Sequence, residues 1–168
     1  MDNGFAESEG MRNLKYLLGI DLGTSGTKTV LFEETGRAVA SETIEYPLYQ
    51  PKNGWAEQEP EDWWNAARDT VKAVIAKSGV KPEDVKGVGI SGQMHGLVLL
   101  DREGRVLRRS ILWCDGRTQE ECDEITQTIG KERLIELSAN PALTGFTAGK
   151  ILWVRKHEPE VYEKAAHI

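Results

Sequence analysis

The sequence predicts an α/β domain in which helices pack against a sheet of short strands. Three strand patterns follow one another on short turns between residues 16 and 46. They indicate an antiparallel meander, because parallel strands require long crossover connections. A long amphipathic helix pattern comes next, and further strand and helix patterns follow it. This order is typical of a domain that combines one sheet with flanking helices.

The strands of the meander are expected at residues 16–21, 27–33 and 38–46. The first is an apolar run, and the third alternates apolar with polar side chains, as a half-buried strand does. Residues 34–37, Glu-Thr-Gly-Arg, form a tight turn before the third strand. Residues 47–54, which include two prolines and a glycine, form a loop after it.

The long helix is expected to begin near Pro60, since proline is tolerated in a first helical turn and the following acids complement the helix dipole. Gly79 is the expected end. Apolar residues at helical spacing predict the side that packs on the sheet: Trp63, Ala67, Val71, Val74 and Ile75. At least one of the adjacent Trp63 and Trp64 is expected in the core.

The rest of the chain contains shorter patterns. Strands are expected at residues 86–91 and 97–101, with a turn at 102–105 and a short apolar run at the start of 111–115. Helices are expected at residues 117–129, 131–138, 149–156 and 158–166.

Composition excludes several classes of function. The net charge is −6 at pH 7 and there is no long basic run, so neither nucleic acid nor an anionic membrane is the expected partner. Apolar runs such as 97–100 are too short to span a bilayer. The acidic start, MDNGFAESEG, resembles neither a secretory signal nor a transit peptide. We expect a cytoplasmic protein with a disordered leader at 1–15, Met11 as an alternative start, and one domain at 16–168.

The two cysteines, Cys114 and Cys122, match no CxxC or zinc spacing. The sequence leaves a disulfide between them open, and reduced thiols are the expectation because the protein is expected to be cytosolic. The sequence contains three histidines, which disfavours a histidine-rich metal site.

Two glycine-rich stretches match common motifs only in part. Residues 87–92, Gly-Val-Gly-Ile-Ser-Gly, have the letters of GxGxxG but lie in a strand pattern that another strand follows. The dinucleotide fingerprint must instead open a helix. Residues 23–28 lack the P-loop spacing, and a strand pattern rather than a helix comes after them.

Residues 21–28, Asp-Leu-Gly-Thr-Ser-Gly-Thr-Lys, form the most distinctive stretch. A simple hairpin turn needs one or two special residues, and this turn has many more. Glycines let the backbone approach a ligand, successive N–H groups can bind an anion, and a carboxylate at a strand end suits Mg²⁺. From the residues alone a structural hairpin and a phosphate site both remain open, with the phosphate site favoured.

Four segments together indicate a family. Residues 19–28, Gly-Ile-Asp-Leu-Gly-Thr-Ser-Gly-Thr-Lys, closely resemble the first phosphate loop of the actin-like ATPase superfamily, which includes sugar kinases, heat-shock chaperones and actin. Three later segments resemble FGGY-family carbohydrate kinases: 54–60 (Gly-Trp-Ala-Glu-Gln-Glu-Pro), 89–96 (Gly-Ile-Ser-Gly-Gln-Met-His-Gly) and 112–117 (Leu-Trp-Cys-Asp-Gly-Arg). Gln-Met-His-Gly is most similar to xylulokinases. The motifs occur in the family's order, and the resemblance runs from about Tyr16 to the last residue.

The resemblance implies an incomplete first domain of two ribonuclease-H-like domains, built on a mixed sheet with flanking helices. ATP and sugar would bind in the cleft between the two domains. By similarity, Asp21 is the expected catalytic and Mg²⁺-binding residue, close to the transferred phosphate. The residues expected to bind ATP are Gly23, Thr24, Ser25 and Lys28.

The same resemblance implies a sugar site at Gln93, Met94 and His95, with Trp55 and Asp115 beside it. An imidazole can donate a hydrogen bond to a sugar hydroxyl or accept one from it. The alternative is that His95 is a satisfied structural residue at a strand end. Trp55 and Trp113 lie in or beside loops, and either could stack on a sugar, whereas Trp153 is expected to pack in the core.

No segment resembles the later family motif that carries the general base, or the second phosphate loop. We therefore expect the N-terminal part, about a third, of an ATP- and Mg²⁺-dependent kinase that phosphorylates D-xylulose to D-xylulose 5-phosphate, inactive as this fragment. The alternatives are a kinase for glycerol, ribulose or gluconate, and a non-catalytic actin-like binding module. Homodimerisation is left open, and apolar surface that later residues would cover is expected to be exposed.

Overall fold

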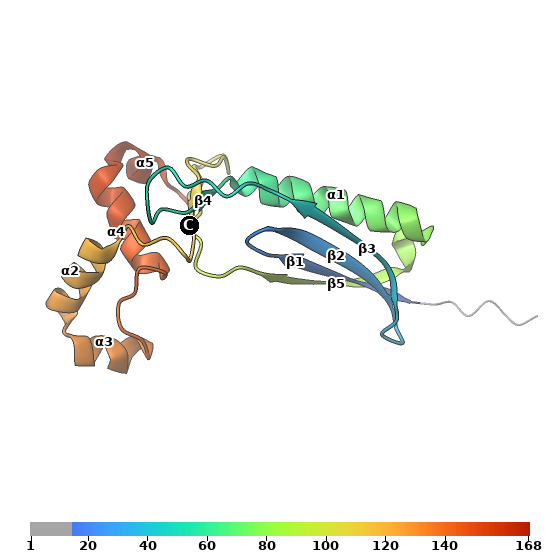
Figure 1. Ribbon diagram of the computed structural model, residues 1–168, viewed down its shortest axis with the longest axis horizontal. Helices are drawn as coiled ribbons and strands as arrows, with labels where there is room; N and C mark the ends of the chain where they lie inside the picture. Colours follow the sequence, from blue (N-terminus) through green and yellow to red (C-terminus); the bar gives the residue numbers. More distant parts are fainter. Residues whose placement is uncertain (1–14) are drawn as a thin grey trace, which may run out of the picture.

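A four-stranded mixed sheet dominates one end of the molecule (Figure 1), in a computed structural model that describes residues 15–168. The strand order is β3-β2-β1-β5. The predicted antiparallel meander is confirmed in β1 (Tyr16–Leu22), β2 (Gly26–Glu33) and β3 (Ala38–Glu45). β5 (Val85–Gly92) then pairs with β1 in parallel, after a short 3₁₀ turn at Pro82–Asp84. The expected leader at 1–15 and Met11 fall almost entirely outside the described residues.

Helix α1 (Pro60–Ser78) covers one face of the sheet over β2 and β3 (Figure 1). It ends where predicted, because Gly79 takes the left-handed conformation, φ 66°, and its N–H donates to the carbonyl oxygen of Ile75. Leu18, Leu31 and Val74 are the buried centre of the core between helix and sheet. This packing fixes the orientation of the two strands that carry the Asp21 turn.

The predicted sheet-facing side of α1 is correct only in part. The fully buried residues are Ala66, Thr70 and Val74. The cause is polar: Thr70 Oγ1 lies 2.7 Å from Thr29 Oγ1 on β2, in a buried hydroxyl pair. An apolar pattern cannot indicate a helix face centred on such a pair. Neither tryptophan of the first turn is fully buried, since Trp63 is half-buried and Trp64 is exposed.

The predicted strand at 97–101 is wrong as a regular strand. Leu97 and Leu100 form isolated bridges with Ile111, Val106 and His167. Beside them, a two-stranded antiparallel sheet pairs β4 (Glu57–Gln58) with β6 (Ser110–Ile111), which the sequence patterns did not predict. The turn at 102–105 is present, closed by the Gly104 N–H donating to the Asp101 carbonyl oxygen.

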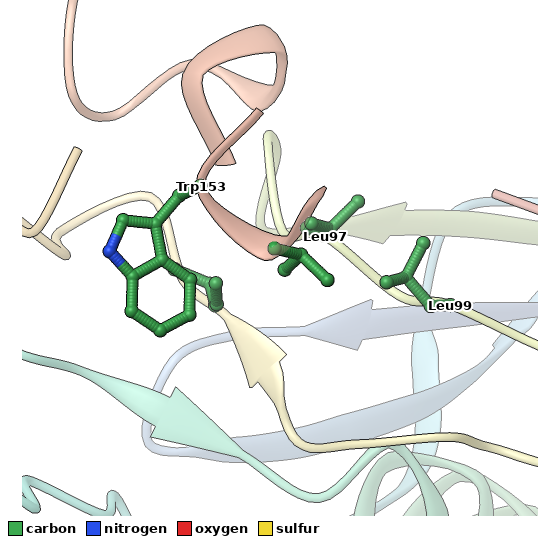
Figure 2. Packing of buried hydrophobic residues seen from close by; sticks show 5 residues of the cluster. Leu97, Leu99 and Trp153 are labelled. Carbon is green, nitrogen blue, oxygen red and sulfur yellow. The ribbon is translucent and has the colours of Figure 1, made fainter. Parts of the chain in front are cut away.

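The helices at the other end of the molecule occur where they were predicted, with small shifts in their bounds (Figure 1). They are α2 (Gln119–Ile129), α3 (Lys131–Ser138), α4 (Thr147–His157) and α5 (Pro159–Lys164). A second core joins α4 to the segment after β5 through Leu97, Leu99, Ile111, Trp153 and Val154 (Figure 2). The predicted packing role of Trp153 is thereby confirmed.

The face of the sheet opposite α1 bears an open hollow, and the edge strand β5 is exposed. Val88 and Ile90 on β5 are 59% and 72% exposed, and Leu17 on β1 is also exposed. Exposed apolar side chains are therefore present on β1 and β5. No helix within residues 15–168 is long and apolar enough to cross a membrane.

Substituting Gly26 tests how tightly the meander closes around the turn. In Gly26→Ala the new Cβ would lie 2.7 Å from the carbonyl oxygen of Ile44 on β3. We expect the free energy of unfolding to fall by about 1–3 kcal/mol, measured by urea denaturation. Gly89→Ala is the matched control, because its Cβ would meet only the Leu18 carbonyl oxygen at 4.0 Å. Equal losses in both variants would contradict this account.

Candidate functional site

The turn between β1 and β2 has a fixed shape. The Gly23 N–H donates to the Gly26 carbonyl oxygen at 3.0 Å, and Asp21 lies opposite Lys28 across the two strands. The hydroxyl of Tyr46 donates to the Gly23 carbonyl oxygen at 2.6 Å. Burial raises the pKa of that hydroxyl, which keeps it protonated as a donor. The turn predicted to bind phosphate is thus held from behind by the end of the meander.

Gln58, on β4, connects the segments that line the site, and the sequence did not single it out. Its buried carboxamide donates from Nε2 to the Thr24 carbonyl oxygen at 2.7 Å, and its Oε1 accepts from Gln93 Nε2 at 2.9 Å. Trp63 Nε1 donates to the same oxygen at 3.1 Å. Gln58 therefore connects the Asp21 turn, the segment after β5 and helix α1. Its position inside the 54–60 motif was the only signal of this role.

The side chain of Gln93 forms hydrogen bonds with other residues of the protein. Its Nε2 donates to Gln58, and its Oε1 accepts from Thr24 Oγ1 at 3.3 Å. Trp113 Nε1 donates to that same threonine hydroxyl at 3.2 Å. The predicted phosphate and sugar segments are therefore joined by hydrogen bonds. Gln93 is in the lining, but its amide acts mainly to hold the wall in place.

A cavity of about 800 Å³ lies between these segments. The predicted site residues in its lining are Asp21, Gly23, Thr24, Gln93, Met94 and His95. The other lining residues were not predicted as a group: Leu22, Gly92, Trp113, Leu143, Thr144, Gly145 and Phe146. The lining combines one carboxylate, one imidazole and several hydroxyl or amide groups with apolar walls, a mixture suited to a small polar ligand.

His95 has an unusual backbone. Its φ is 61°, in the left-handed region that residues with a Cβ seldom adopt. Its imidazole lies against the Phe146 ring, with 4.8 Å between ring centroids. Met94 beside it is 65% exposed and lies at the cavity. The segment predicted to contact sugar therefore faces the cavity with two accessible side chains.

The opposite wall, residues 143–146, is held by helix α4 and by the residue that precedes α2. Lys150 on α4 is completely buried, and its Nζ donates to the carbonyl oxygens of His95 at 2.6 Å and Gly145 at 2.7 Å. Thr118 Oγ1 donates to the Thr144 carbonyl oxygen at 3.3 Å. Burial lowers the pKa of the Lys150 ammonium to about 8, against the attraction of the Asp115 carboxylate.

Four predicted site residues lie outside the cavity lining, and two of them, Asp115 and Trp55, lie in the interior behind it. Asp115 is buried, where it accepts from the Ala56 N–H at 2.6 Å and pairs with Arg117. The Trp55 ring contacts the Arg117 guanidinium, 3.7 Å from its centroid, and packs edge-on against Trp153. Arg117 also pairs with Glu57. The structure places Trp55 and Asp115 behind the site, since the 112–118 segment turns inward to form this charge cluster.

Lys28 and Ser25 lie apart from the main cavity. Lys28 lines a second hollow of about 420 Å³ on the open face of the sheet, together with Asp21 and Phe32. Ser25 is exposed at the tip of the turn. Asp21 lines both hollows.

The residues present fit a hydrated magnesium ion better than a metal held by the protein alone. Residues 15–168 contain no cluster of three or more His, Cys, Asp or Glu side chains that could hold a metal. Asp21 supplies one exposed carboxylate beside a turn rich in N–H and hydroxyl groups. Mg²⁺ commonly binds through one or two carboxylates, water and substrate phosphates.

Cys114 and Cys122 are both free thiols.

Comparison with known proteins gives consistent matches. The chain matches the N-terminal domain of the FGGY family of carbohydrate kinases over residues 16–168. It is 45% identical to the xylulose kinase of Bacillus subtilis, covering 91% of this chain and 30% of that protein. The chain thus spans about a third of the length of such relatives.

Solved structures agree with this match. The xylulose kinase of Rhodospirillum rubrum has a TM-score of 0.85 at 30% identity, over 90% of this chain and 31% of that one. A gluconate kinase from Lactobacillus acidophilus has a TM-score of 0.82 at 30% identity, over 90% of this chain and 30% of that one. The expected fold class is therefore confirmed.

The buried ammonium of Lys150 predicts a pH dependence of stability. Its pKa is about 8 in the folded chain and 10.5 is the ordinary value, so the unfolded chain binds more protons between these pH values. Stability should therefore rise with pH across this range, by on the order of 1–3 kcal/mol from this group. Lys150→Met should lack this component in urea unfolding at pH 7.5 to 10.5. Parallel pH profiles for the two proteins would contradict the assignment.

Proposed function

The chain belongs to the FGGY family of carbohydrate kinases, and from this we propose that it is the N-terminal part of an ATP-dependent kinase that converts D-xylulose into D-xylulose 5-phosphate. One observation carries the proposal: a single cavity combines the predicted phosphate-binding residues Asp21, Gly23 and Thr24 with the predicted sugar segment. Similarity to the xylulose kinase of Bacillus subtilis supports the choice of sugar.

In this proposal the turn at 23–26 binds the phosphates of ATP through backbone N–H groups, that of Thr24 included, and through the Ser25 hydroxyl. Asp21 holds Mg²⁺, which when bound offsets the charge of the transferred phosphate. Lys28, opposite Asp21 across the strands, adds a positive charge beside it. Phosphoryl transfer asks little covalent chemistry of a protein, so these residues act by positioning and electrostatics.

The sugar is assigned to the other side of the cavity. His95 is exposed, so either ring nitrogen can form a hydrogen bond with a sugar hydroxyl. Trp113 and Phe146 provide aromatic walls for the apolar faces of the sugar. The hydrogen bonds of Thr24 with Gln93 and Trp113 keep the two halves of the cavity in register. Trp55 and Asp115 are assigned a supporting role instead of contact.

Two alternative functions are considered beside phosphorylation of D-xylulose. Another FGGY kinase is one, and similarity to a gluconate kinase structure supports it. A non-catalytic actin-like module that binds a nucleotide or sugar is the other. NMR titration of the His95 ring with D-xylulose, ribulose, glycerol and gluconate separates them. Strongest binding of D-xylulose supports the proposal, strongest binding of gluconate favours the first alternative, and nucleotide binding without any sugar response favours the module.

The 168-residue chain should show no sugar-dependent turnover by itself. Asp21 is the one carboxylate among the described residues that line the cavity, and the proposal assigns it to Mg²⁺. We therefore place the base that deprotonates the sugar hydroxyl outside residues 15–168. A coupled ADP-release assay with D-xylulose and magnesium-ATP measures this, with the Bacillus subtilis enzyme as positive control. Sugar-dependent turnover that persists through further purification would show that the base lies within this chain.

A chimera makes the catalytic role of Asp21 measurable. Residues 16–168 would replace the matching region of the Bacillus subtilis xylulose kinase, with which they share 45% identity. In this chimera Asp21→Asn should lower kcat by about 100-fold or more, because the amide has nearly the same shape but lacks the charge that attracts Mg²⁺. Circular dichroism would show that the fold is retained. A well-folded Asp21→Asn chimera with full activity contradicts the assignment.

The same chimera tests His95. His95→Ala should raise KM for D-xylulose by about tenfold and leave KM for ATP nearly unchanged, because it removes a hydrogen-bond partner of the bound sugar, and one such bond is worth about 0.5–1.5 kcal/mol. The control is Lys77→Ala, which removes a surface ion pair between α1 and Glu42 on β3, away from the residues that line the cavity. Unchanged sugar kinetics together with a lower melting temperature would assign His95 a structural role.

A further inference from the structure

Lys150 occupies a position where a charge is normally unfavourable. The side chain is 0% exposed, and it projects from the buried side of α4, which also carries Trp153 and Val154. A buried lysine needs partners for its N–H groups. Here the partners are backbone carbonyl oxygens from two separate segments, those of His95 and Gly145.

Both segments are irregular where Lys150 contacts them. His95 lies in the coil that follows β5, and Gly145 lies in the coil that precedes α4. Thr147 Oγ1 adds a weaker bond to the His95 carbonyl oxygen, at 3.5 Å. Neither segment has regular sheet pairing at these residues. The two short hydrogen bonds from Lys150 Nζ therefore connect two walls of the cavity that no β-sheet pairing connects.

The backbone conformation of His95 explains why these two hydrogen bonds of Lys150 matter. A left-handed backbone is costly for a residue with a Cβ, and it persists only when surrounding contacts hold it. The carbonyl oxygen bound by Lys150 belongs to that same residue. The ring that contacts the imidazole belongs to Phe146. This residue directly follows Gly145, whose carbonyl oxygen Lys150 also binds.

Resting on the function proposed above, we infer that Lys150 is a positioning residue: by binding the carbonyl oxygens of His95 and Gly145 it holds the imidazole against Phe146 and fixes the sugar-facing wall of the cavity. It does not touch the sugar. Its ammonium acts through the backbone of the two segments, with charge-assisted hydrogen bonds that are stronger than neutral ones.

The first measurement needs no ligand and no substitution. In the 168-residue chain labelled with ¹⁵N-lysine and ¹³C-carbonyl histidine and glycine, Lys150 should give an ammonium signal protected from exchange. That signal should show scalar couplings across hydrogen bonds to the His95 and Gly145 carbonyl carbons. A Lys150 ammonium that exchanges as fast as the surface lysine Lys77 and shows no such coupling would overturn the inference.

The second measurement compares two variants on the same helix. Lys150→Met removes the donors while keeping a similar length, and Val154→Ala weakens the core of α4 without touching the cavity. We expect the nuclear Overhauser effect between the His95 and Phe146 rings to fall at least about fivefold in Lys150→Met and to persist in Val154→Ala. If both variants keep the ring contact, or both lose it equally, Lys150 has only a structural role.

D-xylulose then separates this inference from the proposed function. The dissociation constant, read from the His95 ring signal, should rise about tenfold or more in Lys150→Met and less than about twofold in Val154→Ala. If the unsubstituted chain does not respond to D-xylulose, the proposed function fails in this respect, and the ring contact still decides the role of Lys150. A folded Lys150→Met chain that binds D-xylulose like the unsubstituted chain overturns the inference.

Discussion

One buried carboxamide, that of Gln58, holds the architecture of the site together. Its two N–H groups donate to the carbonyl oxygens of Thr24 and Pro47, and its oxygen accepts from Trp63 and Gln93. An amide has two donors and two acceptor positions, and all four are used. Such a group has no alternative orientation of equal energy, since flipping it would set donors against donors. The relative position of the turn at 23–26 and the wall at 93–96 is therefore set by a side chain that belongs to neither segment and does not line the cavity.

Sheet topology brings those two segments within reach of Gln58. Because β1 and β5 run parallel, they finish at the same end of the sheet, with Leu22 paired to Gly92. The residues that follow the two strands, about 70 apart in sequence, consequently emerge side by side. The antiparallel turn back into β2 then places Lys28 next to Asp21. A ligand at this edge meets both groups of residues without any long loop having to fold over it.

Local patterns were enough to predict the meander and the helices, and distant partners were needed to predict the residues that support the site. The meander and α1 follow from strand alternation, turn residues and helix ends that lie within a few positions of one another. The segment at 97–101 has a strand-like composition, but its partners are single residues of other loops, so no regular ladder forms. Gln58 and Lys150 are polar residues whose roles depend on carbonyl groups far away in sequence. For Lys150 the sequence contains one signal, which is a charged residue on the apolar side of a predicted helix.

Three of the five tryptophans lie in two different environments, and the other two, Trp63 and Trp64, are on α1. Trp55 and Trp153 are packed against each other and against the guanidinium of Arg117, so their emission reports on the interior of the helical end. Trp113 is 48% exposed, lines the cavity and is hydrogen-bonded to Thr24. A molecule entering the cavity displaces water from this indole or alters its hydrogen bond, and either event changes the colour and yield of its emission. The protein thus carries its own fluorescent indicator of occupancy at the point where the two halves of the cavity meet.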